Sequence, residues 1–196
     1  MILIADSGAS KTDWGCVSRE SDVRIRFSSQ GYNPNYITGP QIVEDILKNK
    51  PAELDPEAVK EIYFYGAGVT PLQYPFMEET LRKVFTKAET VFIAMDTLAS
   101  CRALLGRKSG FSAILGTGAN TCLYDGCNEG LNVDSCGFIL GDEGSGAVLG
   151  RTLVSDIFKG VAPRHIVEQF EAEYGLSQAD VLEAVYRQPQ ANRYLA

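Results

Sequence analysis

Histidine is nearly absent from this sequence, because His165 is its single example among 196 residues. A zinc or transition-metal site built on imidazole needs several such ligands, so one histidine cannot make one. His165 falls in an expected helix beside Arg164, Glu168 and Gln169. That setting favours a solvated or locally paired side chain over a catalytic one.

Basic residues are also few, with 18 Lys and Arg against 25 Asp and Glu, and the net charge is -7. Nucleic-acid grooves and anionic membrane surfaces both select clustered Lys and Arg, so we expect neither as a partner. Any phosphate group must be held locally, by backbone amides and a metal ion, rather than by a broad basic field.

Long apolar runs are missing too. The chain opens with MILIAD, without the basic residues and longer apolar core of a signal peptide, and no stretch of about 20 apolar residues follows. The cysteines are odd in number and scattered, which is typical of reduced thiols: Cys16, Cys101, Cys122, Cys127 and Cys136. We therefore expect a cytoplasmic protein.

No low-complexity segment or Pro/Gly/Ser-rich linker interrupts the chain, and 45% hydrophobic residues suit a globular fold. Apolar periodicity predicts an antiparallel meander of strands at 2–5, 14–18 and 23–28. A helix at 41–48, a strand at 61–65, a helix at 76–85, a strand at 90–95 and a helix at about 97–105 follow. This mixed α/β order predicts a ribonuclease-H-like unit over residues 1–108.

The pattern restarts at residue 109. We expect strands at 111–115, 120–124 and 137–140, a long helix at about 143–158 and an amphipathic helix at 176–186. Residues 109–196 are thus interpreted as the first, incomplete part of a second copy of the unit. We expect the chain to be truncated, with nucleotide affinity and activity reduced if an adenosine-binding part is missing.

The turn DSGASKTDW, which begins at Asp6, lies between the first two expected strands. Gly8 permits a tight turn whose amides can approach a phosphate, and Ser10 and Thr12 add hydroxyl groups. Asp6, at the end of an apolar strand, suits Mg²⁺. The turn is no Walker A loop, because Ser10 stands where that motif needs glycine. An ordinary polar β-turn is the alternative interpretation.

A second glycine turn, Gly116, Thr117 and Gly118, opens the second unit in the same strand-turn-strand setting. Two such turns predict two loops that face each other and hold a triphosphate with its metal; two unrelated hairpins are the alternative. The later segment GDEGSG, from Gly141 to Gly146, leaves little bulk at the start of the long helix. We expect a ligand or another backbone to approach closely there.

Asp96 follows the strand expected at 90–95. Phosphoryl transfer to an alcohol needs a carboxylate within hydrogen-bond reach of the hydroxyl, and a strand-end aspartate can supply it. A plain helix N-cap explains Asp96 equally well on its own.

Together, DSGASKTDW, MDTLAS, GTGAN and GDEGSG, in this order, resemble the BadF/BadG/BcrA/BcrD ATPases, an actin-like branch that includes N-acetylglucosamine kinase. The resemblance covers residues 2 to about 159. It implies an ATP-dependent kinase of the actin-like fold that phosphorylates the 6-hydroxyl of N-acetylglucosamine or a related amino sugar.

The resemblance also implies roles for single residues. Asp6 positions Mg²⁺, and Asp96 is the base toward the sugar hydroxyl. Asn33 and Asp142 contact the sugar. The phosphate loops of ATP binding are Gly8, Ser10 and Thr12, and then Gly116, Thr117 and Gly118. Homodimers are common in this superfamily, so a homodimer is possible.

One departure concerns residues 134–140, where animal N-acetylglucosamine kinases carry a glycine-rich segment with a tryptophan. The identity of the sugar therefore stays open. Two other functions stay open as well. One is an activator ATPase with an iron-sulfur cluster shared between subunits, for which Cys127 and Cys136 lie in the right region. The other is a sugar or nucleotide sensor without catalysis.

Overall fold

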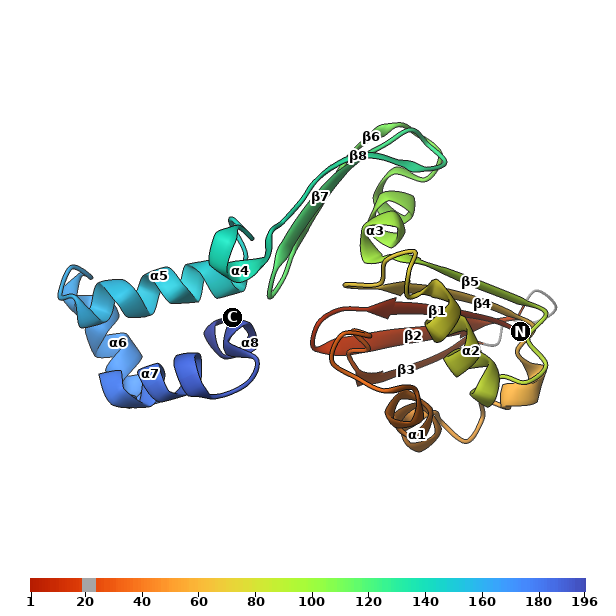
Figure 1. The fold of residues 1–196 in the computed structure, drawn as a ribbon, viewed down its shortest axis with the longest axis horizontal. Helices are drawn as coiled ribbons and strands as arrows, with labels where there is room; N and C mark the ends of the chain where they lie inside the picture. Colours follow the sequence, from red (N-terminus) through yellow and green to blue (C-terminus); the bar gives the residue numbers. More distant parts are fainter. Residues whose placement is uncertain (19–23) are drawn as a thin grey trace. The chain divides into compact units, whose positions relative to one another are not determined.

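The computed structural model describes residues 1–18 and 24–196. Two compact units make up the chain: a first unit of residues 1–110 and 124–129, and a second of residues 111–123 and 130–196. Figure 1 labels the elements. Those of the first unit are β1 (Ile2–Ser7), β2 (Lys11–Val17), β3 (Arg24–Gln30), α1 (Gly39–Asn49), the 3₁₀ helix η1 (Pro56–Ala58), β4 (Glu61–Gly66), α2 (Tyr74–Val84), β5 (Thr90–Met95) and α3 (Asp96–Leu105).

The sheet of the first unit has five strands in the order β3-β2-β1-β4-β5. Strands β1, β2 and β3 form the expected antiparallel meander, and β4 and β5 continue parallel to β1. This topology confirms the α/β fold inferred from the sequence. Val23, the first residue of the third expected strand, lies outside the described residues.

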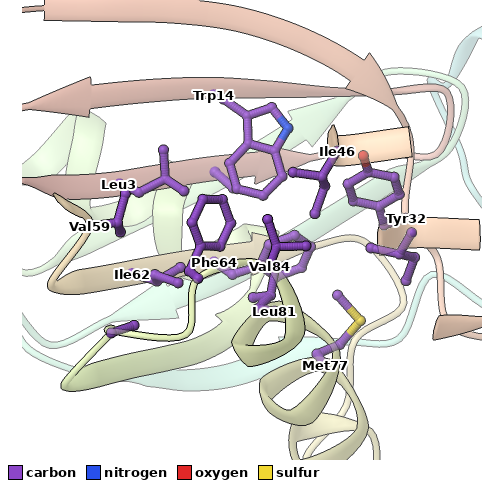
Figure 2. Packing of buried hydrophobic residues seen from close by; sticks show 14 of the residues in the cluster. Leu3, Trp14, Tyr32, Ile46, Val59, Ile62, Phe64, Met77, Leu81 and Val84 are labelled. Carbon is purple, nitrogen blue, oxygen red and sulfur yellow. The ribbon is translucent and has the colours of Figure 1, made fainter. Parts of the chain in front are cut away.

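Helices α1 and α2 cover one face of this sheet, where the core lies around Trp14 (Figures 1 and 2). The indole stacks on Phe27 at 5.5 Å between ring centroids and meets Phe64 at 6.2 Å. Its Nε1 donates to Ser29 Oγ at 2.9 Å, so burial leaves no polar atom of the ring unpaired. The alternation of β1 and β2 points Leu3, Ala5 and Trp14 into this core.

Helix α3 contacts β1, β4 and β5 and meets the aromatic residues of the other face. Arg102 lies over the rings of Tyr65 and Phe92 and donates to Tyr65 Oη at 2.7 Å. A guanidinium on aromatic faces binds through both its charge and its planar surface. Arg102 therefore fixes the orientation of α3 on the sheet.

A three-stranded sheet in the order β6-β7-β8 precedes the helices of the second unit. The tip of the β7–β8 hairpin, residues 124–129, belongs to the first unit. Helix α8 returns to pack on α5 and α7 (Figure 1). The elements are β6 (Gly110–Leu115), β7 (Ala119–Tyr124), β8 (Glu129–Val133), α4 (Gly137–Leu140), α5 (Gly146–Phe158), α6 (Arg164–Tyr174), α7 (Gln178–Arg187) and α8 (Ala191–Leu195).

The strand expected at 137–140 was wrong, because those residues form the short helix α4. The third strand is β8, which begins five residues after the last residue of β7. Asp125 caps that turn by accepting the N–H groups of Cys127 and Asn128 at 2.7 Å each, while Gly126 takes a φ of 103°. Asp-Gly is a hairpin signal that the sequence interpretation passed over.

The long helix also begins later than expected, at Gly146, because Ser145 is its N-cap and accepts from Val148 N. In the described part of the chain, no helix combines the length and apolarity needed to cross a membrane.

Candidate active site

Asp6 and Asp96 lie at one edge of the five-stranded sheet. Asp6 is next to last in β1, and Asp96 directly follows β5. The parallel register aligns Ser7 with Gly66 of β4, and Gly66 with Met95 of β5. Strands two places apart are about 10 Å apart at their backbones, so two carboxylates can converge on one small molecule there.

The Asp96 carboxylate is half-buried at the start of α3. Burial, with the negative charge of Asp6 as the second cause, raises its pKa to about 6. The backbone N–H of Thr97 donates to Asp96 Oδ1 at 3.0 Å, which opposes the rise. A carboxylate tuned in this way is a better proton acceptor than an ordinary aspartate and still ionised at neutral pH.

Asp6 has a second acidic neighbour in Asp13, its cross-strand partner on β2. Partial desolvation and then the charge of Asp13 raise the Asp6 pKa. Asp13 itself is bound by Ser28 Oγ at 2.7 Å and by Lys11 Nζ at 3.0 Å. Carboxylate oxygens are the ligands that a hard divalent cation prefers, and a cation at Asp6 would offset the repulsion from Asp13, so the Asp6 side chain fits the Mg²⁺ expected there.

The first glycine turn is braced by a buried chain of hydroxyl groups. Thr12 Oγ1 donates to Gln30 O at 2.8 Å, so the Ser7 hydroxyl must donate to Thr12 across 2.7 Å. Ser7 Oγ in turn accepts Tyr32 N at 3.0 Å. Thr12 is fully buried, and its hydroxyl therefore braces the turn from behind.

Backbone amides are the donors that this first turn can offer. The turn closes through Gly8 N, which donates to Lys11 O at 2.9 Å. Over the described residues, the N–H of Ala9 has no protein acceptor. A Cβ at Gly31 would lie 2.4 Å from Gly8 O, so glycine is required for the loop after β3 to seat against the turn. Ser10 is exposed at its outer edge.

Asn33 lies in the loop after β3, against the loop that follows β4. Its side chain covers Gly68, where a Cβ would stand 2.6 Å from Asn33 Nδ2 and where φ is 71°. Asn33 Oδ1 accepts Asn35 N at 3.0 Å, and Asn35 Oδ1 accepts Gln73 Nε2 at 3.0 Å. These bonds hold the Asn33 amide in a defined place within the first unit.

In the second unit, the glycine turn packs on the N-terminus of α5. Gly146 N and Ala147 N donate to the carbonyls of Gly116 at 2.8 Å and Thr117 at 3.2 Å. Among residues 1–18 and 24–196, the N–H groups of Thr117 and Gly118 have no protein acceptor. A turn with its carbonyls occupied and its amides open suits an anion such as phosphate.

Asp142 closes the other side of this turn. It is buried, its Oδ1 accepts Ala119 N at 3.0 Å, and a Cβ at Gly118 would lie 3.0 Å from Oδ2. Its backbone is left-handed, with a φ of 57°. Asp142 thus holds the glycine turn in shape, a contact that the sequence did not predict.

Sequence reasoning missed Glu129, a hairpin-tip residue that contacts the first turn of α3 beside Asp96. The Thr97 hydroxyl donates to the Glu129 carboxylate, and Glu129 is a further, smaller cause of the raised Asp96 pKa. No motif contains Glu129, since it lies 33 residues from Asp96 and only the hairpin brings it close. A correct prediction of the Asp125–Gly126 turn would have located it.

The two cysteines considered for a cluster are exposed free thiols, Cys127 in the first unit and Cys136 in the second. Within the described ranges, no group of three or more His, Cys, Asp and Glu side chains is arranged to hold a metal.

Two of the solved structures that are similar to this chain are candidate N-acetylglucosamine kinases. A candidate N-acetylglucosamine kinase from Porphyromonas gingivalis is 41% identical over 100% of this chain and 69% of its own, with a TM-score of 0.92. A second candidate N-acetylglucosamine kinase, from Chromobacterium violaceum, has 17% identity, covers 99% and 71% of the two chains, and has a TM-score of 0.70. The second likeness supports the fold alone.

No protein-family model and no curated protein matches the chain. The match to the P. gingivalis protein covers every element described above, at 41% identity over the whole chain. The chain therefore belongs to the family of that protein, among the actin-like sugar kinases.

Proposed function

We propose that this protein transfers the terminal phosphoryl group of ATP to the 6-hydroxyl of N-acetylglucosamine or a related amino sugar. The observation that carries the proposal is the half-buried Asp96 carboxylate at the sheet edge beside Asp6. Membership in the family of the P. gingivalis candidate N-acetylglucosamine kinase supports the reaction class. We also place the protein in the BadF/BadG/BcrA/BcrD branch, on its four ordered motifs.

Asp96 accepts the proton of the sugar hydroxyl as the oxygen attacks phosphorus. Its pKa of about 6 leaves it ionised at neutral pH and raises its basicity over that of a solvated aspartate. The Thr97 N–H holds one carboxylate oxygen, which leaves the other to face the substrate. Asn33, held by its own loop, orients the sugar by hydrogen bonds to its hydroxyl groups.

Each unit by itself offers backbone N–H groups to a phosphate: those of Thr117 and Gly118 in the second unit, and that of Ala9 in the first. Asp6 is the residue that would hold Mg²⁺, with Asp13 beside it. When bound, the cation neutralises charge on the phosphate oxygens. Within the second unit, Asp142 keeps the glycine turn in place through its bond to Ala119 N.

The test is a coupled ADP-release assay on this chain with ATP and Mg²⁺ across amino and neutral sugars. We expect turnover with N-acetylglucosamine or another amino sugar, and a product that carries phosphate on the 6-oxygen. ADP release at the same rate with every sugar and without sugar would refute the kinase and favour an ATPase that activates a partner.

A further inference from the structure

The tip of the β7–β8 hairpin, residues 124–129, contacts helix α3 at both of its ends. At the N-terminal end, the Thr97 hydroxyl donates to the Glu129 carboxylate. At the C-terminal end, Tyr124 Oη donates to Gly106 O, the cap residue of α3, at 3.2 Å. Gly126 sits so close that a Cβ would lie 2.6 Å from Arg107 O. The tip is therefore seated along the helix that carries Asp96.

The tip has a defined shape of its own, which fixes where Glu129 lies. Asp125 N donates to Asn128 O at 3.1 Å, and the Asp125 carboxylate accepts two backbone N–H groups of the same turn. Burial of a β-turn with internal bonds costs little further entropy, because its backbone is already ordered. Glu129 follows that turn directly and begins β8.

Thr97 needs the acceptor that Glu129 provides. Only 2% of Thr97 is exposed, so its hydroxyl has little water to bind. A buried hydroxyl without a partner costs free energy, and a charged acceptor gives one of the stronger hydrogen bonds available. Glu129 makes this bond although it lies close enough to Asp96 to help raise the pKa of that carboxylate.

We propose that Glu129 is a positioning residue for Asp96, which it holds in the reactive orientation by anchoring the first turn of α3 through the Thr97 hydroxyl. Thr97 is covalently next to Asp96 and donates its backbone N–H to the Asp96 carboxylate. A shift of Thr97 thus moves both the backbone and the hydrogen bond that orient the base. The catalytic part of this inference rests on the proposed function.

Three substitutions separate positioning from packing. Glu129→Ala and Thr97→Val remove the two partners, and each should lower kcat about tenfold to a hundredfold, the loss typical of one charge-assisted bond, with the KM for ATP within about twofold. Because both remove one interaction, the double variant should be no slower than the slower single variant. Thr97→Ser keeps the hydroxyl and should retain kcat within about threefold.

Tyr124→Phe is the matched control, because it removes the hydrogen bonds of Tyr124 Oη at the C-terminal end of α3, with Gly106 O and with the Arg102 guanidinium. Its kcat should stay within about twofold of the unsubstituted chain. If Tyr124→Phe slows the reaction as much as Glu129→Ala, or if the effects of Glu129→Ala and Thr97→Val multiply in the double variant, the positioning role is refuted.

Amide hydrogen exchange tests the anchor without any catalysis. In Glu129→Ala and Thr97→Val, the amides of Ser100 to Arg102, which close the first turn of α3, should exchange faster, whereas in Tyr124→Phe they should not. Unchanged exchange in the first two variants would overturn the anchor. If the chain shows no sugar-dependent turnover but exchange responds as stated, the proposed function fails and the anchor stands.

Discussion

The ionised Asp96 carboxylate lowers the stability of the folded protein, and its proposed role as the base in the reaction explains why it is kept there. The carboxylate lies half-buried near Asp6 and Glu129, and its pKa is about 6 in the fold against 3.8 for an ordinary aspartate. The folded chain therefore binds more protons than the unfolded chain between these two values. By linkage, the free energy of unfolding falls as the pH rises from about 4 to about 6.

This sign gives the first prediction. Without metal ions, Asp96→Asn should be more stable than the unsubstituted chain at pH 7, by about 1–3 kcal/mol. The asparagine side chain is neutral, so folding does not have to bury a charge. The advantage should shrink as the pH falls from 6 to 4, where the aspartate of the unsubstituted chain becomes protonated. Urea unfolding in a chelator, at several pH values, measures it.

Asp125→Asn is a control for this prediction, because the fold lowers the pKa of Asp125 whereas it raises that of Asp96. Bonds from Asn128 and Cys127 lower the Asp125 pKa, so its contribution to stability is present above the unfolded pKa and is lost as the pH falls. The variant should be less stable than the unsubstituted chain at pH 7. An Asp96→Asn variant that is destabilised in parallel with Asp125→Asn would contradict the raised pKa.

Helices α5 and α8 show what the glycines of the GDEGSG region do. A Cβ at Gly150 would lie 1.8 Å from Leu195 O, and one at Gly146 would lie 3.1 Å from Ala196 Cβ. The close approach expected from the sequence is thus made by the backbone of α8. Leu195 is buried as a result, although it stands at the end of the chain.

Gly150→Ala tests this packing. Because the obstacle is backbone, α8 must move away, and we expect a loss of about 1–3 kcal/mol together with faster proteolysis near residues 188–196. Gly130→Ala is the control within the second unit, since its Cβ would meet only ordinary contacts at 3.6 Å and beyond. Equal proteolysis of both variants would show that α8 does not pack on α5 as described.

The two units differ in how much apolar surface they bury. The first has a large aromatic core around Trp14, Tyr32, Phe64 and Phe85. In the second, large apolar side chains stay exposed, including Leu115 at 67%, Leu131 at 72% and Leu149 at 63%. Stability scales with apolar burial, so the second unit should be the weaker one.

Heating should therefore unfold the chain in two steps. Far-UV ellipticity should fall first, as α5 to α8 of the second unit melt, and the fluorescence of Trp14, the single tryptophan, should change later. Trp14 reports the first unit because its ring is almost fully buried there. Superimposable transitions by both probes would contradict independent units.

Much of the fold of the first unit could be predicted from the spacing of apolar residues along the sequence. Alternation at Ile25 and Phe27 and the apolar run before Asp6 predicted their strands, because one face of each is buried. The errors lie in the second unit, where Phe138, Ile139 and Leu140 form a helical turn with little burial. An apolar triplet carries no period of its own, so tertiary context decided its structure.

The residues of the candidate site also divide into those that the sequence could predict and those that it could not. Asp6 and Asp96 could be predicted because strand ends carry them to one edge of the sheet. Glu129 could not, since its contact with Thr97 depends on the hairpin tip that folds onto α3. The structural duties of Thr12 and Asp142, in bracing their turns, also depend on partners far along the chain.

The most direct test of the central claim is sugar-dependent ADP release by Asp96→Asn against the unsubstituted chain, with Asp180→Asn, in the first turn of α7, as the control. Loss of a general base predicts a fall in kcat of about 10²–10⁴-fold in Asp96→Asn, with the KM for the sugar little changed and Asp180→Asn nearly as active as the unsubstituted chain. Sugar-dependent turnover that survives in Asp96→Asn would remove Asp96 from the reaction and contradict the account.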